Sequence, residues 1–233
     1  MSRPTTRGAT QRHAGRSMDI LAAFTRYVAQ HGYAGANFSE IANELGISKG
    51  TIVHHYGTKD RLFAAMHDLY MERRLAEAHQ LLQKFDDPAE RLAGLLFSFL
   101  LYQVVDRDST VAFQREAATL ATHDALIRGR QLRASYLELV RGVLSDGIER
   151  GVFRPLDVQV QSLLIFGSSQ WAWTWFHPDG DLTALDVGSS FVQLVLGGLL
   201  QDRSDLDLLA DPGGPIASAV ESILHEARES LDD

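Results

Sequence analysis

Residues 38–56 read FSEIANELGISKGTIVHHY, and this stretch decides the fold of the N-terminal part of the chain. Two short helices can cross at a steep angle only if the first helix has a small residue at the crossing point. The turn after that helix must also adopt a left-handed conformation, which favours glycine. Ala42 and Gly46 stand four residues apart in these two roles. The apolar residues expected to hold the pair onto a preceding helix are Ile41, Leu45, Ile47 and Ile52. The stretch therefore predicts a helix-turn-helix, an arrangement whose second helix can enter a major groove.

The second helix of this pair offers hydroxyl, lysine and histidine side chains and carries no acid. The free N–H groups of its first turn and the positive end of its dipole favour a phosphate. Gly50 allows the backbone to approach DNA closely, while Lys49 can contact phosphates or base edges. The residues predicted on these grounds to contact DNA are Ser48, Lys49, Gly50, Thr51, His54, His55, Tyr56 and Lys59. The alternative is a tight helical hairpin with no DNA-binding role.

The chain of 233 residues has a net charge of −8, but this charge is unevenly distributed. Residues 1–61 carry eight basic and four acidic side chains, whereas the other 172 residues carry 14 basic and 26 acidic ones. The N-terminal end can therefore meet a polyanion while the acidic remainder repels DNA. Residues 1–16, which hold four arginines, are expected to form a disordered basic arm.

Composition and missing motifs exclude several classes of protein. The chain has no cysteine, so disulfides, thiolate metal sites and cysteine nucleophiles are impossible. Apolar runs are too short to span a bilayer and residues 1–16 lack the apolar core of a secretory signal, so we expect a cytoplasmic protein with no membrane partner. Neither a Gly-x-x-x-x-Gly-Lys-Ser/Thr loop nor a Gly-x-Ser-x-Gly elbow occurs, and His54 and His55 point about 100° apart on a helix. We therefore expect no metal, no cofactor and no enzymatic activity.

Helical periodicity extends along nearly the whole chain, and no stretch shows sustained polar/apolar alternation. This predicts an all-α fold of about ten helices, with a small three-helix head at the N-terminus and a larger C-terminal body. The expected divisions are a disordered basic arm at 1–16, a helix-turn-helix domain at 17–62, a ligand-binding and dimerisation domain at 63–202, and a linker with an extra C-terminal helix at 203–233. The helices expected beyond the head span residues 60–84, 88–105, 108–120, 124–150, 156–176, 182–200 and 216–231.

The body is rich in aromatic residues, which at helical spacing most often form core. A long pocket between its helices would suit an acyl or polycyclic group. The residues predicted to line this effector pocket are Phe97, Leu101, Phe113, Arg133, Tyr136 and Trp171. At its mouth Arg115, Arg130 and Arg133 could meet a phosphate or carboxylate, although arginines on long helices are commonly just solvated.

The three tryptophans indicate a subunit interface. Trp171 and Trp175 share one helical face, and Trp173 lies on roughly the opposite one. Large rings on both faces indicate a helix covered on one side by its own core and on the other by a second subunit. The helices at 157–176 and 182–200 are therefore predicted to form a two-fold, four-helix interface in a homodimer. The residues predicted to lie in it are Gly167, Trp175, Val192, Val195 and Leu199.

From residue 16 to residue 71 the sequence resembles the TetR family of bacterial transcriptional repressors. The resemblance lies in residues 20–32, in residues 38–45 and above all in residues 46–63, GISKGTIVHHYGTKDRLF. It implies a symmetric dimer in which each head docks in one major groove, and a C-terminal body that binds a small effector.

The same resemblance adds Asn37 or Ser39 to the residues that contact DNA. One position departs from the family pattern: Val53 stands where the family usually has an aromatic residue that packs on the DNA backbone. Val53 can offer only an apolar contact, for example to a thymine methyl group.

The C-terminal half is similar to TetR-family members that regulate lipid or steroid catabolism and respond to acyl-CoA thioesters. The similar pieces are residues 113–117 (FQREA), 147–154 (GIERGVFR) and 175–183 (WFHPDGDLT). They imply an acyl-CoA, fatty acid or steroid-like effector. The predicted function is a ligand-responsive repressor that binds a palindromic operator as a homodimer and is released by this effector. The alternatives are a small-molecule binding protein whose head does not read DNA, and an α-helical enzyme.

Overall fold

The computed structural model describes residues 6–116 and 124–232, and their regular secondary structure is helical apart from one antiparallel bridge between Phe153 and Leu200. The helices are α1 (Thr6–Gly35), α2 (Phe38–Glu44), α3 (Lys49–Tyr56), α4 (Lys59–Lys84), α5 (Pro88–Val105), α6 (Arg107–Arg115), the 3-10 helix η1 (Asp124–Leu126), α8 (Ile127–Glu149), α9 (Val158–Gln170), α10 (Ala172–Trp175), α11 (Ala184–Leu199), α12 (Leu206–Leu209) and α13 (Pro215–Asp232). The predicted all-α fold is confirmed.

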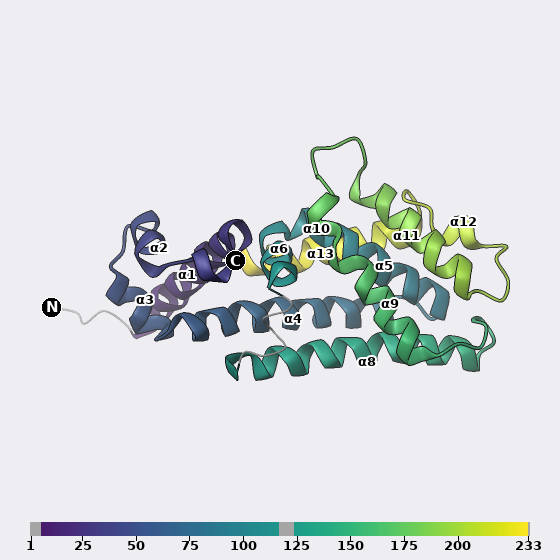
Figure 1. The fold of residues 1–233 in the computed structure, drawn as a ribbon, viewed down its shortest axis with the longest axis horizontal. Coiled ribbons are helices and arrows are strands. Elements are labelled where there is room, and N and C mark those ends of the chain that lie inside the picture. Colours follow the sequence, from purple (N-terminus) through teal and green to yellow (C-terminus); the bar gives the residue numbers. More distant parts are fainter. Residues whose placement is uncertain (1–5, 117–123, 233) are drawn as a thin grey trace.

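The molecule is elongated, with α1–α3 forming a head at one end and the other helices forming a larger body (Figure 1). Helix α4 begins in the head and runs along the body beside α8. Helix α5 lies in the middle of the body, where α8, α11 and α13 pack against it. The boundary expected between residues 62 and 63 therefore falls inside a continuous helix that links head and body.

Local sequence signals account for the two short helices of the head. The Asn37 side chain accepts hydrogen bonds from the backbone N–H groups of Ser39 and Glu40 and so caps α2. Gly46 has a φ of +62°, the left-handed conformation that the turn was predicted to need. Ile41 and Ile52 are fully buried beneath the pair, as expected.

The N-terminal helix is longer than the sequence indicated. Helix α1 begins at Thr6, so the expected disordered arm is wrong for residues 6–16, and residues 1–5 lie outside the described part of the chain. Gly32 has a φ of +75° and kinks the helix, which then continues to Gly35. The physical reason for the early start is that Arg, Ala and Gln are good helix formers, and together they make up six of the eleven residues from 6 to 16.

One predicted helix of the body is broken. The helix expected at 156–176 ends at Gln170, and α10 restarts after Trp171. The hydroxyls of Ser168 and Ser169 donate to the carbonyls of Leu164 and Phe166, a local competition that bends helices. The helix expected at 108–120 corresponds to α6, whose described part ends at residue 115; residues 117–120 lie outside the described part.

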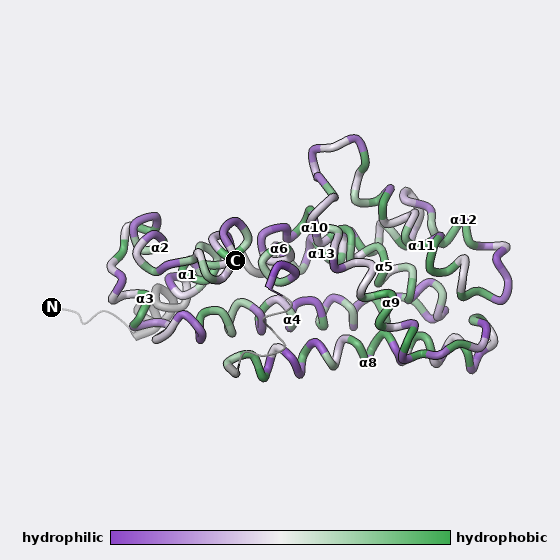
Figure 2. The backbone as a smooth tube through the Cα atoms, viewed as in Figure 1, coloured by the Kyte–Doolittle hydropathy of each residue, from purple (hydrophilic) through white to green (hydrophobic). Residues whose placement is uncertain are grey.

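The C-terminal segment is an integral part of the body. Helix α13 packs against α5 and α4, and its Ile216 and Val220 approach Gly94 of α5. The segment expected to be a linker also contains the short helix α12. The hydrophobic colouring of Figure 2 extends along α5 and α11, and α5 is buried over most of its length. In the described ranges, no helix combines the length and apolar character that a membrane span requires.

Candidate DNA-binding surface and effector cavity

The first turn of α3 faces outward. The Ser48 hydroxyl accepts a hydrogen bond from the Thr51 N–H at 3.0 Å and lies 2.9 Å from the Thr51 hydroxyl, which fixes the start of the helix. Lys49 and Gly50 are exposed and Thr51 is partly exposed, while Ile52 on the opposite side is fully buried. The predicted surface of hydroxyls, lysine and open backbone is therefore accessible.

Further along α3 the side chains divide between the surface and the interior of the head. Val53 is 45% exposed, so this position is open although its side chain is small. His54 is exposed and His55 is half-buried, with the two rings in an edge-to-face arrangement at 5.8 Å. Ser39, at the start of α2, is also exposed.

Two of the residues predicted to contact DNA are engaged inside the head. The Tyr56 hydroxyl donates to the Ser17 carbonyl at 2.8 Å and accepts from the Ser17 hydroxyl at 2.9 Å, and burial raises the pKa of Tyr56. The Lys59 ammonium donates to the Ala34 carbonyl at 3.4 Å and lies 4.5 Å from the centre of the Tyr33 ring. Both side chains hold α3 and α4 against α1, a role that the sequence did not reveal.

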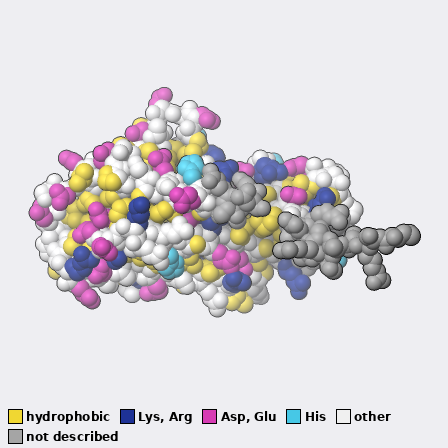
Figure 3. Space-filling view, turned by 180° about the vertical axis from the view of Figure 1, so that it is seen from behind, with side chains coloured by type: hydrophobic (Ala, Val, Ile, Leu, Met, Phe, Trp, Pro, Cys, Tyr) yellow, Lys and Arg dark blue, Asp and Glu magenta, His cyan; other side chains and the backbone are white. Residues whose placement is uncertain are grey.

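Acidic side chains are numerous on one face of the body. On the face shown in Figure 3, acidic side chains are spread over the body, at the end of the molecule away from the head. This agrees with the excess of acidic residues after position 61. A polyanion would therefore meet the head in preference to the body.

An aromatic cavity lies inside the body, where α4, α5, α6, α8 and α9 meet. Its free volume is about 40 Å³, which is too small for an acyl chain or a steroid unless side chains move. The residues that line it are Tyr70, Met71, Arg74, Phe99, Tyr102, Phe113, Gln114, Tyr136, Phe166, Ser169 and Gln170. Rings of Phe99, Tyr136 and Phe166 contact one another at centroid distances of 5.5–6.0 Å.

The structure brings together only two of the predicted pocket residues, Phe113 and Tyr136. Phe97 is fully buried against α11, where a Cβ on Gly188 would lie 2.7 Å from its ring. Leu101 is buried core, and Trp171 is 66% exposed. Helical spacing could not separate these positions, because a helix surrounded by neighbours has no single inward face.

The three arginines expected at the pocket mouth do not line the cavity. Arg130 and Arg133 are half-buried on α8, and burial lowers the pKa of Arg133. Arg115 reaches the head instead, as described below. The arginine that does line the cavity is Arg74, which the sequence analysis missed.

Arg74 belongs to a buried ion cluster. Its guanidinium lies 2.9 Å from the Glu77 carboxylate and 3.4 Å from that of Asp106, which Arg73 also approaches at 2.7 Å. The guanidinium stacks over the ring of Tyr102 at 3.9 Å. In sequence, Arg74 and Glu77 look like an ordinary surface pair at i and i+3, and only the packing of α5 and α13 over α4 buries them.

Burial raises the pKa of Glu77 from an ordinary value of 4.5 to about 7, although the positive charge of Arg74 acts in the opposite direction. A carboxyl group whose pKa is raised in the folded state stabilises the fold below its unfolded pKa, and this stabilisation is lost as the pH rises through the folded pKa. We expect the free energy of unfolding to fall between about pH 5 and pH 7.5, and Glu77→Gln to reduce this fall by on the order of 1–3 kcal/mol.

Urea unfolding at a series of pH values measures this difference. Glu149→Gln, at an exposed position on α8, is the matched control and should keep the wild-type pH dependence. Identical pH dependence in wild type and Glu77→Gln would contradict the expected titration.

Helix α6 connects the aromatic cavity to the head. Phe113 and Gln114 line the cavity, while the next residue, Arg115, donates to the carbonyls of Ala29 and Gln30 at 3.1 Å each. The carboxylate of Glu116 accepts from the Tyr33 N–H at 2.8 Å. These hydrogen bonds satisfy backbone groups that lose their partners within the helix because α1 is kinked at Gly32. A movement of α6 therefore acts directly on α1.

Aromatic rings form a second connection between cavity and head. Tyr70 stacks on Phe113 at 4.5 Å, and Phe113 lies 5.2 Å from the His67 ring. His67 in turn lies 4.5 Å from Phe63, and Phe63 lies 4.3 Å from Tyr33 of α1. The chain of contacts runs without interruption from the wall of the cavity to the helix that carries the helix-turn-helix.

Several exposed apolar side chains lie on α9, α10 and α11 and at the junction of α9 and α10. These are Val160, Leu163, Leu164, Trp171, Trp175 and Leu194. Trp175 and Gly167 are exposed, so their place in an interface stays a prediction, and Trp173 is half-buried. Val192, Val195 and Leu199 are buried within the subunit and α11 packs on α5, so their assignment to an interface is wrong.

Comparison with known families agrees with this arrangement. Residues 20–66 match the family described as "Bacterial regulatory proteins, tetR family", and residues 86–199 match "Tetracyclin repressor-like, C-terminal domain". The chain belongs to the TetR family. The first range covers most of the head of the TetR-family chain and the start of α4, and the second covers α5 to α11 of the body. Helix α13 lies outside both ranges.

Individual TetR-family relatives cover most of the chain. It is 28% identical over 200 residues to the HTH-type transcriptional repressor KstR2 of Mycobacterium tuberculosis (strain H37Rv), which covers 84% of this chain and 96% of the relative. The solved structure of the ketosteroid transcriptional regulator KstR2 of that organism has a TM-score of 0.72 at 28% identity, covering 80% and 96% of the two chains. The structure of AibR in complex with isovaleryl coenzyme A and operator DNA has a TM-score of 0.71 at 26% identity, covering 78% and 98%.

Membership of the TetR family places the chain among transcriptional regulators, which are not enzymes. The described residues contain no group of three or more His, Cys, Asp or Glu side chains suited to hold a metal ion.

Proposed function

We propose that this TetR-family protein is a repressor that binds a palindromic operator as a homodimer and is released by a hydrophobic effector of the acyl-CoA, fatty acid or steroid type. The observation that carries the proposal is the continuous connection from the aromatic cavity through α6 to the kink of α1. The names of the relatives support the effector class, since one is a ketosteroid regulator and another holds isovaleryl coenzyme A beside operator DNA.

In this proposal the effector enlarges the cavity. An apolar group that enters between Phe99, Tyr136 and Phe166 needs more than the free volume of about 40 Å³ and must displace the wall that Phe113 and Gln114 form. Helix α6 then shifts and carries Arg115 and Glu116 with it. The two heads leave the separation of about 34–36 Å, or a multiple of it, that successive major grooves on one side of DNA require.

The proposal is tested with the DNA that flanks the protein's own gene. Acyl-CoA thioesters, free fatty acids, steroids and aromatic acids are first screened for an increase in thermal stability that grows with concentration. Compounds that stabilise the protein are then added to the protein–DNA complex, and DNA binding is followed by fluorescence anisotropy. We expect the same compounds to stabilise the protein and to release the DNA. Binding of a compound without any DNA binding would instead favour the alternative of a small-molecule binding protein, which the small side chain at Val53 makes conceivable.

The role of α3 is tested by Lys49→Ala. Because Lys49 is exposed at the first turn of α3, its loss should remove one phosphate contact, weaken operator binding and lower the slope of log affinity against log salt by roughly one. Anisotropy titrations at several salt concentrations measure both quantities. Lys84→Ala, at an exposed position in the last turn of α4, is the control. An unchanged affinity and slope for Lys49→Ala would refute the contact.

The role of α6 is tested by Arg115→Ala. This substitution removes two hydrogen bonds to the head and leaves the cavity wall intact, so effector binding should persist while effector-induced DNA release weakens. The coupling between the two ligands, typically about 5–150-fold in affinity, should fall toward one. Arg128→Ala on α8, which pairs with Glu72 on the surface, is the control and should keep the coupling. Full coupling in Arg115→Ala would exclude this connection.

A further inference from the structure

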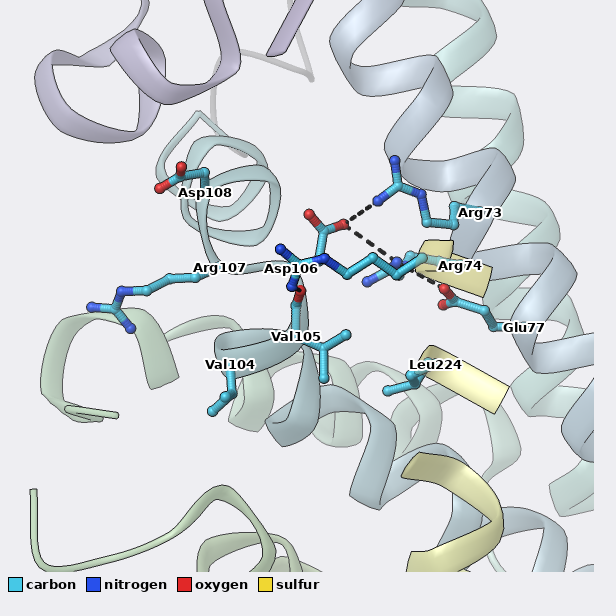
Figure 4. A pocket seen from close by; sticks show the side chains of 10 residues that line it. Arg73, Arg74, Glu77, Val104, Val105, Asp106, Arg107, Asp108 and Leu224 are labelled. Carbon is cyan, nitrogen blue, oxygen red and sulfur yellow. Dashed lines mark hydrogen bonds and ion pairs between the residues drawn. The ribbon is translucent and has the colours of Figure 1, made fainter. Parts of the chain in front are cut away.

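A charged cleft opens beside the buried ion cluster, where α4, the junction of α5 and α6, and α13 meet (Figure 4). Its volume is about 230 Å³, several times that of the aromatic cavity. Arg73, Arg74, Asp106 and Arg228 line the cleft together with Leu224 of α13. Helix α13, with Leu224 and Arg228, lies outside the ranges matched by the TetR family, while the junction of α5 and α6 lies inside the C-terminal one.

Within the described residues, the cleft has more unfilled hydrogen-bond donors than acceptors. Arg74 is 4% exposed, and among the described residues its Nε and Nη1 atoms have no hydrogen-bond acceptor. The Nε atom of Arg73 has no acceptor either. The one buried acceptor without a donor among the residues lining the cleft is Oε2 of Glu77. A ligand that satisfies these groups must therefore bring acceptor oxygens.

The charges around the cleft favour the same conclusion. Its four arginines exceed its three acids, and Figure 4 shows Asp106 held by Arg73 and Arg74, with Glu77 held by Arg74. Arg228 and Arg107 at the rim donate to backbone carbonyls, those of Val105 and Gln103, which carry no net charge to offset a guanidinium. Because burial raises the pKa of Glu77 to about 7, this carboxyl is only partly ionised at neutral pH.

We propose that this cleft binds a phosphate group, with Arg74 and Arg73 at its floor and Arg228 of α13 closing it. Phosphate supplies several acceptor oxygens and a charge that matches the excess of arginine. The group can come from free phosphate or from the phosphates of a larger molecule such as coenzyme A. The site is separate from the aromatic cavity and does not depend on the proposed effector, although Arg74 forms a wall of both.

Isothermal titration calorimetry tests the site with the full-length protein, using inorganic phosphate, coenzyme A and adenosine 3′,5′-bisphosphate at constant ionic strength set with chloride. The test variant is Arg228→Gln combined with Arg107→Gln, because both side chains lie at the rim and their replacement leaves the buried cluster intact. The control is Arg203→Gln, at an exposed position outside the cleft. Circular dichroism melting confirms that each variant is folded.

We expect at least one of the three probes to bind the wild type and the control, and to bind the double variant at least tenfold more weakly. Binding of inorganic phosphate alone identifies free phosphate as the source, and binding of the larger probes alone identifies a phosphate ester. The proposal is overturned if none of the probes binds the wild type, or if the double variant binds them as well as the wild type does. Failure of acyl-CoA to release DNA would leave these outcomes unaffected, so the two proposals are judged separately.

Discussion

The variant Leu194→Glu is expected to be monomeric and to bind its operator about 100-fold more weakly than the wild type. Leu194 is 73% exposed on α11, and with the exposed Trp171 and Trp175 beside and on α10 it belongs to the apolar side chains that an isolated chain would leave in water. A glutamate at this position would bury an unpaired charge in the proposed two-fold interface, and two-fold symmetry places it there twice. A monomer has only one head, so it loses the increase in DNA affinity that two linked heads provide, which is typically about 100-fold or more.

Size-exclusion chromatography with light scattering measures the mass, and anisotropy measures the affinity for the operator. Leu208→Glu is the control, because Leu208 is a similarly exposed leucine on α12, away from α9 and α10. The control should retain the mass and the affinity of the wild type. A dimeric Leu194→Glu protein with normal affinity would show that the interface lies elsewhere.

The variant Gly147→Ala is expected to lose about 3 kcal/mol of stability, since a buried methyl group would be forced into a filled space. A Cβ on Gly147 would overlap the ring of Phe153, which is 1% exposed. The ring cannot move away easily, because the Phe153 N–H donates to the Gly147 carbonyl at 2.9 Å and the chain turns tightly at Gly151, whose φ is +70°. For a chain of this size the midpoint of thermal unfolding should fall by about 6–12 °C.

Gly142→Ala is the matched control, five residues earlier on the same helix. A Cβ there would meet nothing within 4 Å, and alanine is the better helix former, so this variant should be as stable as the wild type or slightly more stable. Thermal and urea unfolding measure both variants. Equal stability of Gly147→Ala and the wild type would mean that Phe153 and its turn can rearrange at little cost.

The DNA-binding head was largely predictable from sequence because its determinants are local. Asn37 and Ser48 act as helix caps, and Gly46 adopts the left-handed turn, through bonds and angles that involve residues at most three positions away. The outward position of Lys49 follows from the burial of Ile52 on the opposite side of α3. The roles of Tyr56 and Lys59 were not predicted, because their partners Ser17 and Ala34 lie on another helix.

The effector cavity was much less predictable. Phe97, Phe99 and Leu101 all lie on α5, which is covered on several sides, and their spacing cannot tell which of them meets the cavity and which meets α11. The same limit explains why Val192 and Val195 were assigned to a subunit interface, when it is Leu194 between them that is exposed.

Periodicity, capping and turn residues were enough to predict the helical fold, the helix-turn-helix and the family, because each of these signals acts over a few positions of the chain. The tertiary structure alone decided which aromatic rings surround the cavity, which apolar residues remain exposed, and that Arg74, Glu77 and Asp106 form a buried ion cluster. The physical reason is that burial depends on which helices pack together, and long-range packing is not encoded in the spacing of residues along any one helix.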